Sequence, residues 1–117
     1  MNAKELNQML LNSFPELLQL YIEEVEWQEG DYTGSHIVFG DIFLPYIESS
    51  VSENRKQIIQ RVGAFIEHIL EMHDEYADEV IMLSVLEVLI SNQSALQYCK
   101  EYFGQYTMKK ILELTDS

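Results

Sequence analysis

Apolar residues recur along this chain at intervals of three and four, the spacing that gathers side chains on one face of an α-helix. A first short helix is predicted over residues 3–12. A second is predicted to begin near Pro15, because proline fits a first helical turn, where its missing N–H has no intrahelical partner to lose. The apolar face of this second helix consists of Leu17, Leu18, Tyr21, Ile22 and Val25.

Residues 28–35 interrupt this periodicity with glycine and other turn-forming residues, so we expect a loop there. Helical spacing resumes over residues 36–50. Pro45 lies inside this segment, where it removes one backbone hydrogen bond and clashes with the preceding turn. We therefore expect a kink or break near residues 42–44. A short strand at residues 36–39 is the alternative for the start of the segment.

The clearest helical pattern covers residues 53–72, and Ser52 is a plausible N-cap for it. Gly63 lies in the middle of this helix, where glycine costs about 1 kcal/mol relative to alanine. A close crossing of another helix at Gly63 would explain that cost. The predicted inward face consists of Ile58, Ile59, Val62, Phe65, Ile66, Ile69 and Leu70.

A helix over residues 75–90, capped by Asp74, is apolar around almost its whole circumference. A helix without a wide polar face is usually buried, so we expect this one to be the central element of the core.

The last part of the chain predicts two more helices. Ser91 or Asn92 starts the first, which runs through Phe103, and Gly104 is expected to end it with a positive φ. Thr107 is expected to open the final helix. The predicted inward residues of that helix are Met108, Ile111 and Leu112.

Six or seven helices joined by short turns predict an all-α fold, an antiparallel helical bundle in a single domain over residues 1–117. Residues 36–50 pair with 53–72, and 75–90 pair with 94–103. Each pair spans about forty residues, which is near the period of HEAT repeats, so the bundle is expected to contain HEAT-like helix pairs. No sequence repeats at that period, and an irregular helical bundle is the alternative.

The charge balance narrows the choice of partner. Twenty Asp and Glu residues outnumber seven Lys and Arg residues, for a net charge of −13. Such a charge repels the phosphates of nucleic acids and anionic lipids, so we expect neither a nucleic acid nor a membrane as the partner. It favours binding to a basic protein. The alternative is that the charge serves solubility alone.

The sequence lacks a second cysteine, a signal peptide and a membrane span, and these three features together indicate the cellular compartment. Cys99 is the only cysteine, which excludes an intrachain disulfide and favours a reducing compartment. Its apolar neighbours predict a buried, unreactive thiol. The first residues do not resemble a signal peptide, and no apolar run reaches the length of a membrane span. We therefore expect a cytoplasmic protein.

Sequence motifs give little sign of catalysis, because no phosphate loop, dinucleotide fingerprint, hydrolase elbow or cysteine zinc pattern is present. The best metal-ligand candidates are His68, Glu71 and His73. A metal site in a helical bundle commonly needs ligands from several helices with a repeated Glu-x-x-His, whereas this His-x-x-Glu occurs once. The solvated helix face is the simpler interpretation. We predict no catalytic residues, no metal ligands and no cofactor.

An acidic segment with two aromatic residues is the best candidate for a binding site. Residues 5–54 contain ten acidic residues and no Lys or Arg. Trp and Tyr are favoured anchors in interfaces, and carboxylates steer a basic partner toward them. The alternative is that Trp27 packs over the edge of the core among solvated acids. The predicted partner-binding residues are Glu23, Glu24, Glu26, Trp27, Glu29, Asp31 and Tyr32.

Four short segments also resemble a family of small acidic bacterial helical proteins. They are Phe14-Pro15-Glu16-Leu17, the acidic helix from Glu23 to Trp27, His36-Ile37-Val38-Phe39-Gly40-Asp41, and Leu44-Pro45-Tyr46. The resemblance implies an immunity-type role, in which the protein neutralises a toxin made by the same or a competing cell. It supplies no catalytic residues, and it assigns no role to the matched His36 and Asp41.

Three functional hypotheses follow. The first is a non-catalytic protein-binding domain, an immunity protein that masks a basic toxin with acidic surfaces near residues 23–32 and 71–79. The second is a HEAT-like scaffold or regulatory subunit that binds a peptide or helix, which an exposed apolar groove would favour. The third is a metal-dependent enzyme that uses His68, Glu71 and His73. The oligomeric state does not follow from the sequence.

Overall fold

The computed structural model describes residues 1–116, and all regular elements within them are helical. The all-α prediction is confirmed, and no strand forms at residues 36–39. The elements are α1 (Ala3–Ser13), η1 (Pro15–Leu17), α2 (Leu18–Glu26), η2 (Gly30–Tyr32), α3 (Ser35–Val38), η3 (Phe39–Phe43), α4 (Leu44–Ser52), α5 (Lys56–Glu71), α6 (Glu75–Val80), η4 (Ile81–Leu86), α7 (Glu87–Ser91), α8 (Gln93–Lys100) and α9 (Gln105–Thr115).

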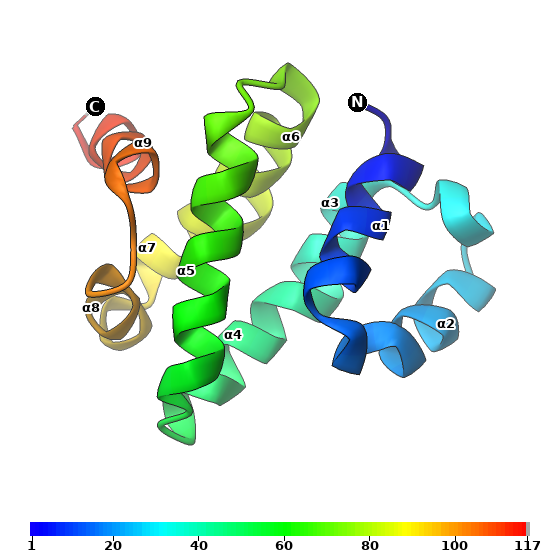
Figure 1. The fold of residues 1–117 in the computed structure, drawn as a ribbon, viewed down its shortest axis with the longest axis horizontal. Helices are drawn as coiled ribbons and strands as arrows, with labels where there is room; N and C mark the ends of the chain where they lie inside the picture. The colour runs from blue at the N-terminus through cyan, green and yellow to red at the C-terminus, as the bar shows by residue number, and fades with distance from the viewer. Residues whose placement is uncertain (117) are drawn as a thin grey trace.

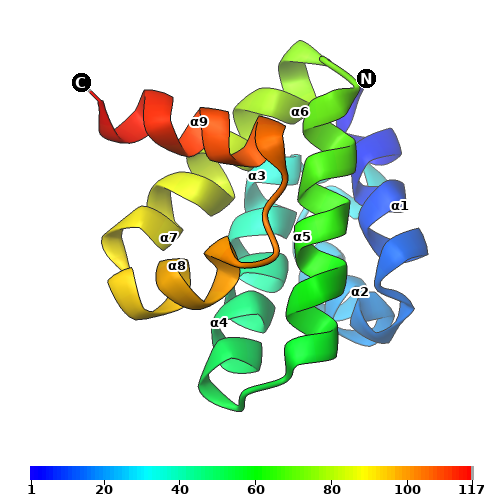
Figure 2. The ribbon, with the colours of Figure 1, turned by 60° about the vertical axis from the view of Figure 1, so that its left-hand side comes forward.

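The long helix α5 lies in the middle of the molecule. The N-terminal helices α1 and α2 lie on one side of it, and α7, α8 and α9 lie on the other (Figures 1 and 2). The helix formed by α3, η3 and α4 packs against both α5 and the helix formed by α6, η4 and α7. Between α7 and α8 the chain turns by 112°. The molecule measures 36 × 32 × 21 Å, and α2 is at its edge.

Four phenylalanine rings form the centre of the N-terminal half of the core. Phe14 lies 5.3 Å from Phe43 and 5.5 Å from Phe65 between ring centroids, and Phe39 stacks on Phe65 at 6.3 Å. Full burial of one phenylalanine side chain stabilises the fold by about 1.5–3 kcal/mol relative to leaving it exposed to solvent. Because these rings come from the end of α1, from η3 and from α5, they hold three distant segments together.

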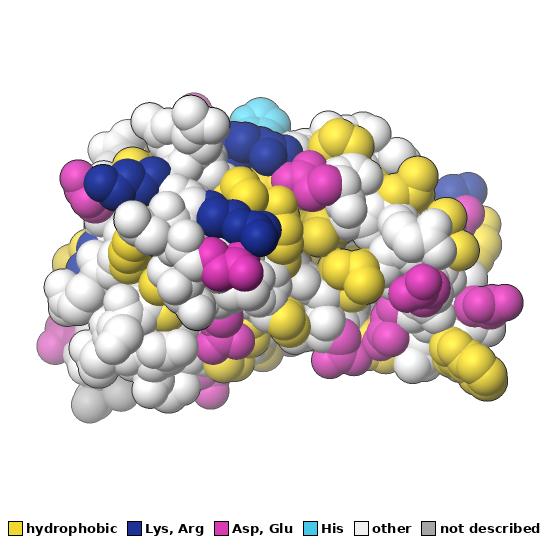
Figure 3. All heavy atoms as spheres, turned by 90° about the horizontal axis from the view of Figure 1, so that it is seen from below, with side chains coloured by type: hydrophobic (Ala, Val, Ile, Leu, Met, Phe, Trp, Pro, Cys, Tyr) yellow, Lys and Arg dark blue, Asp and Glu magenta, His cyan; other side chains and the backbone are white. Residues whose placement is uncertain are grey.

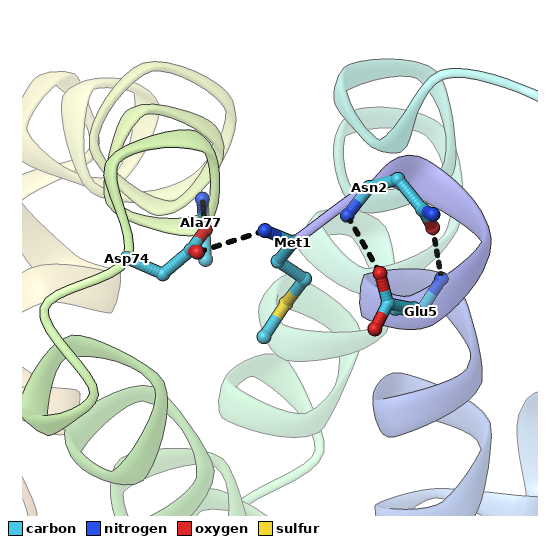
Figure 4. A network of polar contacts seen from close by, with 5 residues as sticks. All are labelled: Met1, Asn2, Glu5, Asp74 and Ala77. Carbon is cyan, nitrogen blue, oxygen red and sulfur yellow. Dashed lines mark hydrogen bonds and ion pairs between the residues drawn. The ribbon is translucent and has the colours of Figure 1, made fainter.

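The start of the chain is fixed in two ways, by the N-terminal cap of α1 and by a contact of Met1 with the cap of α6. Asn2 and Glu5 form a reciprocal capping box on α1 (Figure 4). The amine of Met1 donates to Asp74 at 3.0 Å, while the other carboxylate oxygen of Asp74 accepts from the N–H of Ala77 at 2.9 Å. The predicted cap of the helix from residue 75 is therefore confirmed, and it also anchors Met1.

Pro45 is accommodated by a π-helical segment and does not end the helix. In η3, the N–H of Leu44 donates to the carbonyl of Phe39, five residues earlier, and Pro45 then lies in the first turn of α4. The expected irregularity thus occurs as an opened helical turn. A second π-helical segment, η4, interrupts the helix over residues 75–91, where the N–H of Glu87 donates to Met82.

The predicted N-cap at Ser52 is wrong. Ser52 is the last residue of α4, and α5 begins at Lys56 after Arg55. The chain reverses through Asn54, which has a φ of 56°. Asparagine tolerates this left-handed conformation better than most residues. The helix therefore begins after this turn, three residues later than the capping pattern predicted.

A close approach at Gly63 is present as predicted, but Tyr102, which follows α8, makes it in place of a crossing helix. The role predicted for Gly104 is wrong. A Cβ on Gly63 would lie 2.2 Å from the carbonyl oxygen of Tyr102. Helix α8, capped by Asn92, ends at Lys100, before the predicted end at residue 103. Gly104 has a φ of −86° and precedes α9, which begins at Gln105. There a Cβ would lie 2.4 Å from the side chain of Glu67, so glycine allows a close contact.

Several apolar residues predicted to face inward are exposed. Leu18 and Ile22 are 49% and 48% exposed, because α2 lies at the edge of the molecule and buries only a narrow face. Leu112 of α9 is also exposed. In the helix over residues 75–91, Leu83 and Val88 reach solvent while most of the other apolar residues are buried, so this helix is only partly enclosed.

Within residues 1–116, no single helix is long and apolar enough to cross a membrane; only the bent pair Glu75–Ser91 and Gln93–Lys100 meets the length and composition requirement, when its two helices are taken together.

Candidate functional site

An open groove of about 630 Å³ runs between α2 and the helix that contains η3 and α4. We call it the α2–α4 groove. Its α2 wall consists of Leu20, Glu23, Glu24 and Trp27. Its opposite wall consists of Asp41, Ile42, Pro45, Tyr46 and Ser49.

Helical periodicity explains why these residues share the groove. On α2, Tyr21 and Val25 are buried in the core. Positions 20, 23, 24 and 27 form a neighbouring stripe with intervals of three and four residues, and this stripe faces the groove. The opposite wall has the same kind of spacing. Each wall is therefore one face of a helix.

The groove has an apolar surface beside acidic side chains. Trp27, the first residue after α2, is 84% exposed, and Leu20 is 51% exposed. Packing of Trp27 over the edge of the core, the alternative considered from the sequence, is thereby excluded. On the face seen in Figure 3, acidic and hydrophobic side chains alternate over the half of the molecule that contains α2, and most Lys and Arg side chains lie over the other half.

The acidic side chains of the groove have no basic partner in the described part of the chain. Within residues 1–116, no ion pair involves Glu23, Glu24 or Asp41. A hydrogen bond with Asp41 raises the pKa of Glu24 above its ordinary value, and desolvation and the charge of Asp41 act in the same direction. Two carboxyl groups on opposite walls are therefore close enough to share a proton.

The position of Tyr46 in the opposite wall is fixed by a polar network. Its hydroxyl donates to Glu16 at 2.6 Å, and Arg61 donates to both carboxylate oxygens of Glu16 at 2.9 and 3.0 Å. Burial and the bond to Glu16 raise the pKa of Tyr46 to about 12. Burial alone would raise the pKa of Glu16, but the bonds from Arg61 and Tyr46 outweigh it and lower this pKa to about 2. This wall is thus preorganised.

The structure divides the seven predicted partner-binding residues into three groups. Glu23, Glu24 and Trp27 line the groove, whereas Glu26 and Glu29 are exposed outside it. Asp31 accepts a hydrogen bond from Tyr21 at 3.0 Å, and Lys4 lies 5.5 Å from the ring centroid of Tyr32. The last two residues therefore contact their own chain.

The acidic segment near residues 71–79 does not extend this surface. It lies around the end of α5 and the start of α6, away from α2 in both ribbon views (Figures 1 and 2). Its Asp74 is also engaged by Met1 and Ala77. The two acidic segments are therefore separate surfaces.

The second wall of the groove was not predicted from the sequence. The family resemblance matched Asp41, Pro45 and Tyr46 without giving them a role, and the sequence otherwise indicated only that Pro45 kinks a helix. An acidic residue within an apolar run, with Pro45 and Ser49 four and eight residues later, was the signal for an exposed stripe. The other matched residue, His36, lies outside the groove, where its Nδ1 is 2.8 Å from the hydroxyl of Ser84.

The metal candidates do not form a cluster. Among residues 1–116, no group of three or more His, Cys, Asp and Glu side chains is arranged to hold a metal ion. His68 borders a small pocket beside Arg61, and the His73 ring packs against Tyr106 at 5.2 Å between centroids. Cys99 is buried as predicted, and burial raises the pKa of its thiol to about 11, so the unreactive protonated form dominates at neutral pH.

Comparisons with known proteins identify a family and give no further relatives. Neither a curated protein nor a solved structure matches the chain. The family described as a domain of unknown function, DUF7674, matches residues 7–115, nearly the whole chain. This extent of match shows that the chain belongs to the DUF7674 family.

Proposed function

We propose that this chain is a non-catalytic protein-binding domain whose main contact surface is the α2–α4 groove. The observation that carries the proposal is the exposed Trp27 beside Glu23, Glu24 and Asp41, which form no ion pair within residues 1–116. A large aromatic side chain can anchor an interface once water is excluded from it. Carboxylates around it attract a basic partner and accelerate association.

We further propose that the partner is a basic toxin and that the domain acts as an immunity protein. The resemblance of its FPEL, acidic-helix and HIVFGD segments to small acidic bacterial proteins supports this role, as does the net charge of −13. Electrostatic attraction of this kind predicts fast association that weakens as salt screens the charges.

The second candidate is a HEAT-like scaffold or regulatory subunit that holds a helix or peptide. The apolar part of the groove, with Leu20, Ile42 and Pro45, favours this alternative. The two candidates differ in what binding does to the partner. An immunity protein abolishes the toxicity of its partner, whereas a scaffold binds without neutralising it.

The test uses the product of the adjacent gene, expressed with and without this chain. We expect that product to slow growth when expressed alone and to be neutralised by co-expression. The purified proteins should bind, with at least about tenfold weaker affinity at about 300 mM than at about 50 mM salt. Trp27→Ala should reduce binding, while Leu112→Ala, an exposed apolar residue on α9, should not. A neighbour that does not bind, or binding that is insensitive to salt, would contradict the proposal.

A further inference from the structure

The walls of the α2–α4 groove restrict the form of its partner. Both walls are helix faces, whose backbone hydrogen bonds are made within each helix, so the groove offers side chains only. An extended segment would bring unpaired backbone groups against Leu20, Pro45 and Trp27 at a cost in free energy. A helical segment satisfies its own backbone and avoids that cost. The groove therefore favours a helix.

The length of α2 limits the contact. It has nine residues, which corresponds to a length of about 14 Å. Leu20 and Trp27 lie at the two ends of the α2 wall, seven residues and about two helical turns apart. A partner helix that lies along this wall can therefore place large apolar side chains at two positions that are two turns apart.

The charges between these two apolar positions select a cation. Glu23 and Glu24 lie between Leu20 and Trp27 on one wall, and Asp41 lies on the other. The raised pKa of Glu24 reflects the unfavourable proximity of its carboxyl group to that of Asp41. An Arg or Lys side chain placed between Glu24 and Asp41 would pair with both and remove their repulsion.

We propose that the α2–α4 groove binds an amphipathic basic helix of the partner protein, with an Arg or Lys between Glu24 and Asp41 and with apolar side chains against Leu20 and Trp27. This inference rests on the proposed function, because it specifies how the protein partner is held. The titratable groups that face the binding position are Glu23 and Glu24 from α2, Asp41 from η3 and Tyr46 from α4.

The chain contains its own reporter for this binding, because Trp27 is its single tryptophan. The probe is a synthetic, tryptophan-free peptide of about 18 residues, long enough for partial helix formation, with Leu and Arg on one face. Docking buries Trp27, so we expect its fluorescence emission to shift to shorter wavelength in a saturable titration. Three comparison peptides replace Arg with Glu, replace Leu with Ser, or carry a central proline that breaks the helix. Each should bind at least about tenfold more weakly.

Two protein variants of equal charge test the position of the cation. Glu24→Gln combined with Asp41→Asn removes two of the three groove carboxylates and leaves Glu23. It should weaken binding of the Leu–Arg peptide by about tenfold or more. Glu26→Gln combined with Glu29→Gln removes the same charge from outside the groove, and should weaken binding less than about threefold. Binding by the unmodified chain should also weaken as the pH falls and Glu24 is protonated.

Equal binding of the Leu–Arg and Ser–Arg peptides would show non-specific charge attraction and overturn the inference. Equal losses in the two double variants would overturn it as well, as would full binding of the proline peptide. This titration does not depend on the adjacent gene, so the two proposals can fail separately. If a native partner binds and is unaffected by the groove variant, the proposed function stands and this inference fails.

Discussion

At the scale of single residues, the α2–α4 groove contains an arrangement that does not serve the fold. Glu24 and Asp41 approach each other across the groove, and this proximity raises the pKa of Glu24. A folded-state pKa above the unfolded value means that folding favours the protonated carboxyl. The associated stability is present below the unfolded pKa and is lost as the pH rises through the folded pKa. At neutral pH the repulsion between Glu24 and Asp41 therefore destabilises the folded state, as is common at binding sites.

Replacement of Glu24 by Gln should therefore stabilise the protein at about pH 7, raising the midpoint of thermal unfolding by about 1–3 °C, with a smaller gain near about pH 4. Thermal unfolding followed by circular dichroism over this pH range measures the effect. Glu26→Gln is the matched control, because it removes the same charge from the same end of α2 and lies outside the groove. A loss of stability in Glu24→Gln at neutral pH would contradict the assignment.

Two glycines allow a second comparison between single residues. A Cβ on Gly63 would lie 2.2 Å from a backbone oxygen, which cannot move as a flexible side chain could. Gly63→Ala should lower the free energy of unfolding by about 2 kcal/mol or more, although alanine favours a helix by about 1 kcal/mol. Nothing lies within 4 Å of a Cβ on Gly40, so Gly40→Ala should be neutral or stabilise by about 0.5 kcal/mol. Denaturant titration of both variants tests the contrast, which would be absent if the segment after α8, at Tyr102, did not approach α5 closely.

At the scale of elements, α9 is attached through a cap from another helix. The N–H groups of Tyr106 and Thr107 donate to Glu67 of α5 at 2.9 and 3.0 Å, and the Thr107 hydroxyl donates at 2.8 Å. Burial alone would raise the pKa of Glu67, but these hydrogen bonds outweigh it and lower the pKa below its ordinary value. A carboxylate at a helix N-terminus also interacts favourably with the helix dipole.

Glu67→Ala should thus lower the free energy of unfolding by about 1–2 kcal/mol, the usual cost of losing a helix cap. Amide hydrogen exchange at Tyr106 and Thr107 should accelerate, while exchange in α1 should not. Because the folded-state pKa is lowered, this stabilisation is present above about pH 4.5 and declines as the pH falls through the lowered value. The difference from the unmodified protein should therefore shrink in acid. A difference that grew in acid would show that the cap does not act through its charge.

Two helix caps set by local chemistry were predictable from the sequence, whereas the constraint on Gly104 and one wall of the groove, which depend on distant contacts, were not. The side chains of the caps Asp74 and Asn92 accept hydrogen bonds from N–H groups three residues later in the chain. This spacing can be read directly from the sequence. Gly104 was misassigned because its constraint comes from Glu67, far away in the chain. For the same reason the α2 wall of the groove was partly predicted and the opposite wall was not. That wall depends on how two helices pack.

At the scale of the whole molecule, charge is unevenly compensated. The net charge is −13, and the structure gives few internal ion pairs over residues 1–116. Arg61 is one of the basic residues that pair with an acid, and its partner Glu16 precedes α2. Most of the acidic residues on and after α2 therefore repel one another through solvent, which favours expansion of the chain.

Added salt should accordingly stabilise the isolated protein. Raising sodium chloride from about 10 to about 300 mM screens the repulsion, and should raise the unfolding midpoint by several degrees. The double variant Glu26→Gln with Glu29→Gln should show a smaller rise, because it begins with less charge. Calorimetry of both proteins at equal pH tests this. Salt should therefore have opposite effects on folding and on partner binding, and a midpoint that falls with salt would contradict this account.

The two π-helical segments have a consequence for the evolution of the family. Each segment contains one residue more than an α-helical turn. The hydrogen bonds accepted by the carbonyls of Phe39 and Met82 show this, because each comes from an N–H group five residues later in the chain instead of four. Deleting one residue there would tighten the turn to an α-helix and leave the packing faces on both sides in phase. Single-residue length differences among homologues should therefore concentrate at residues 39–43 and 81–86 and be rare in α5, where a deletion would rotate half of the buried face into solvent.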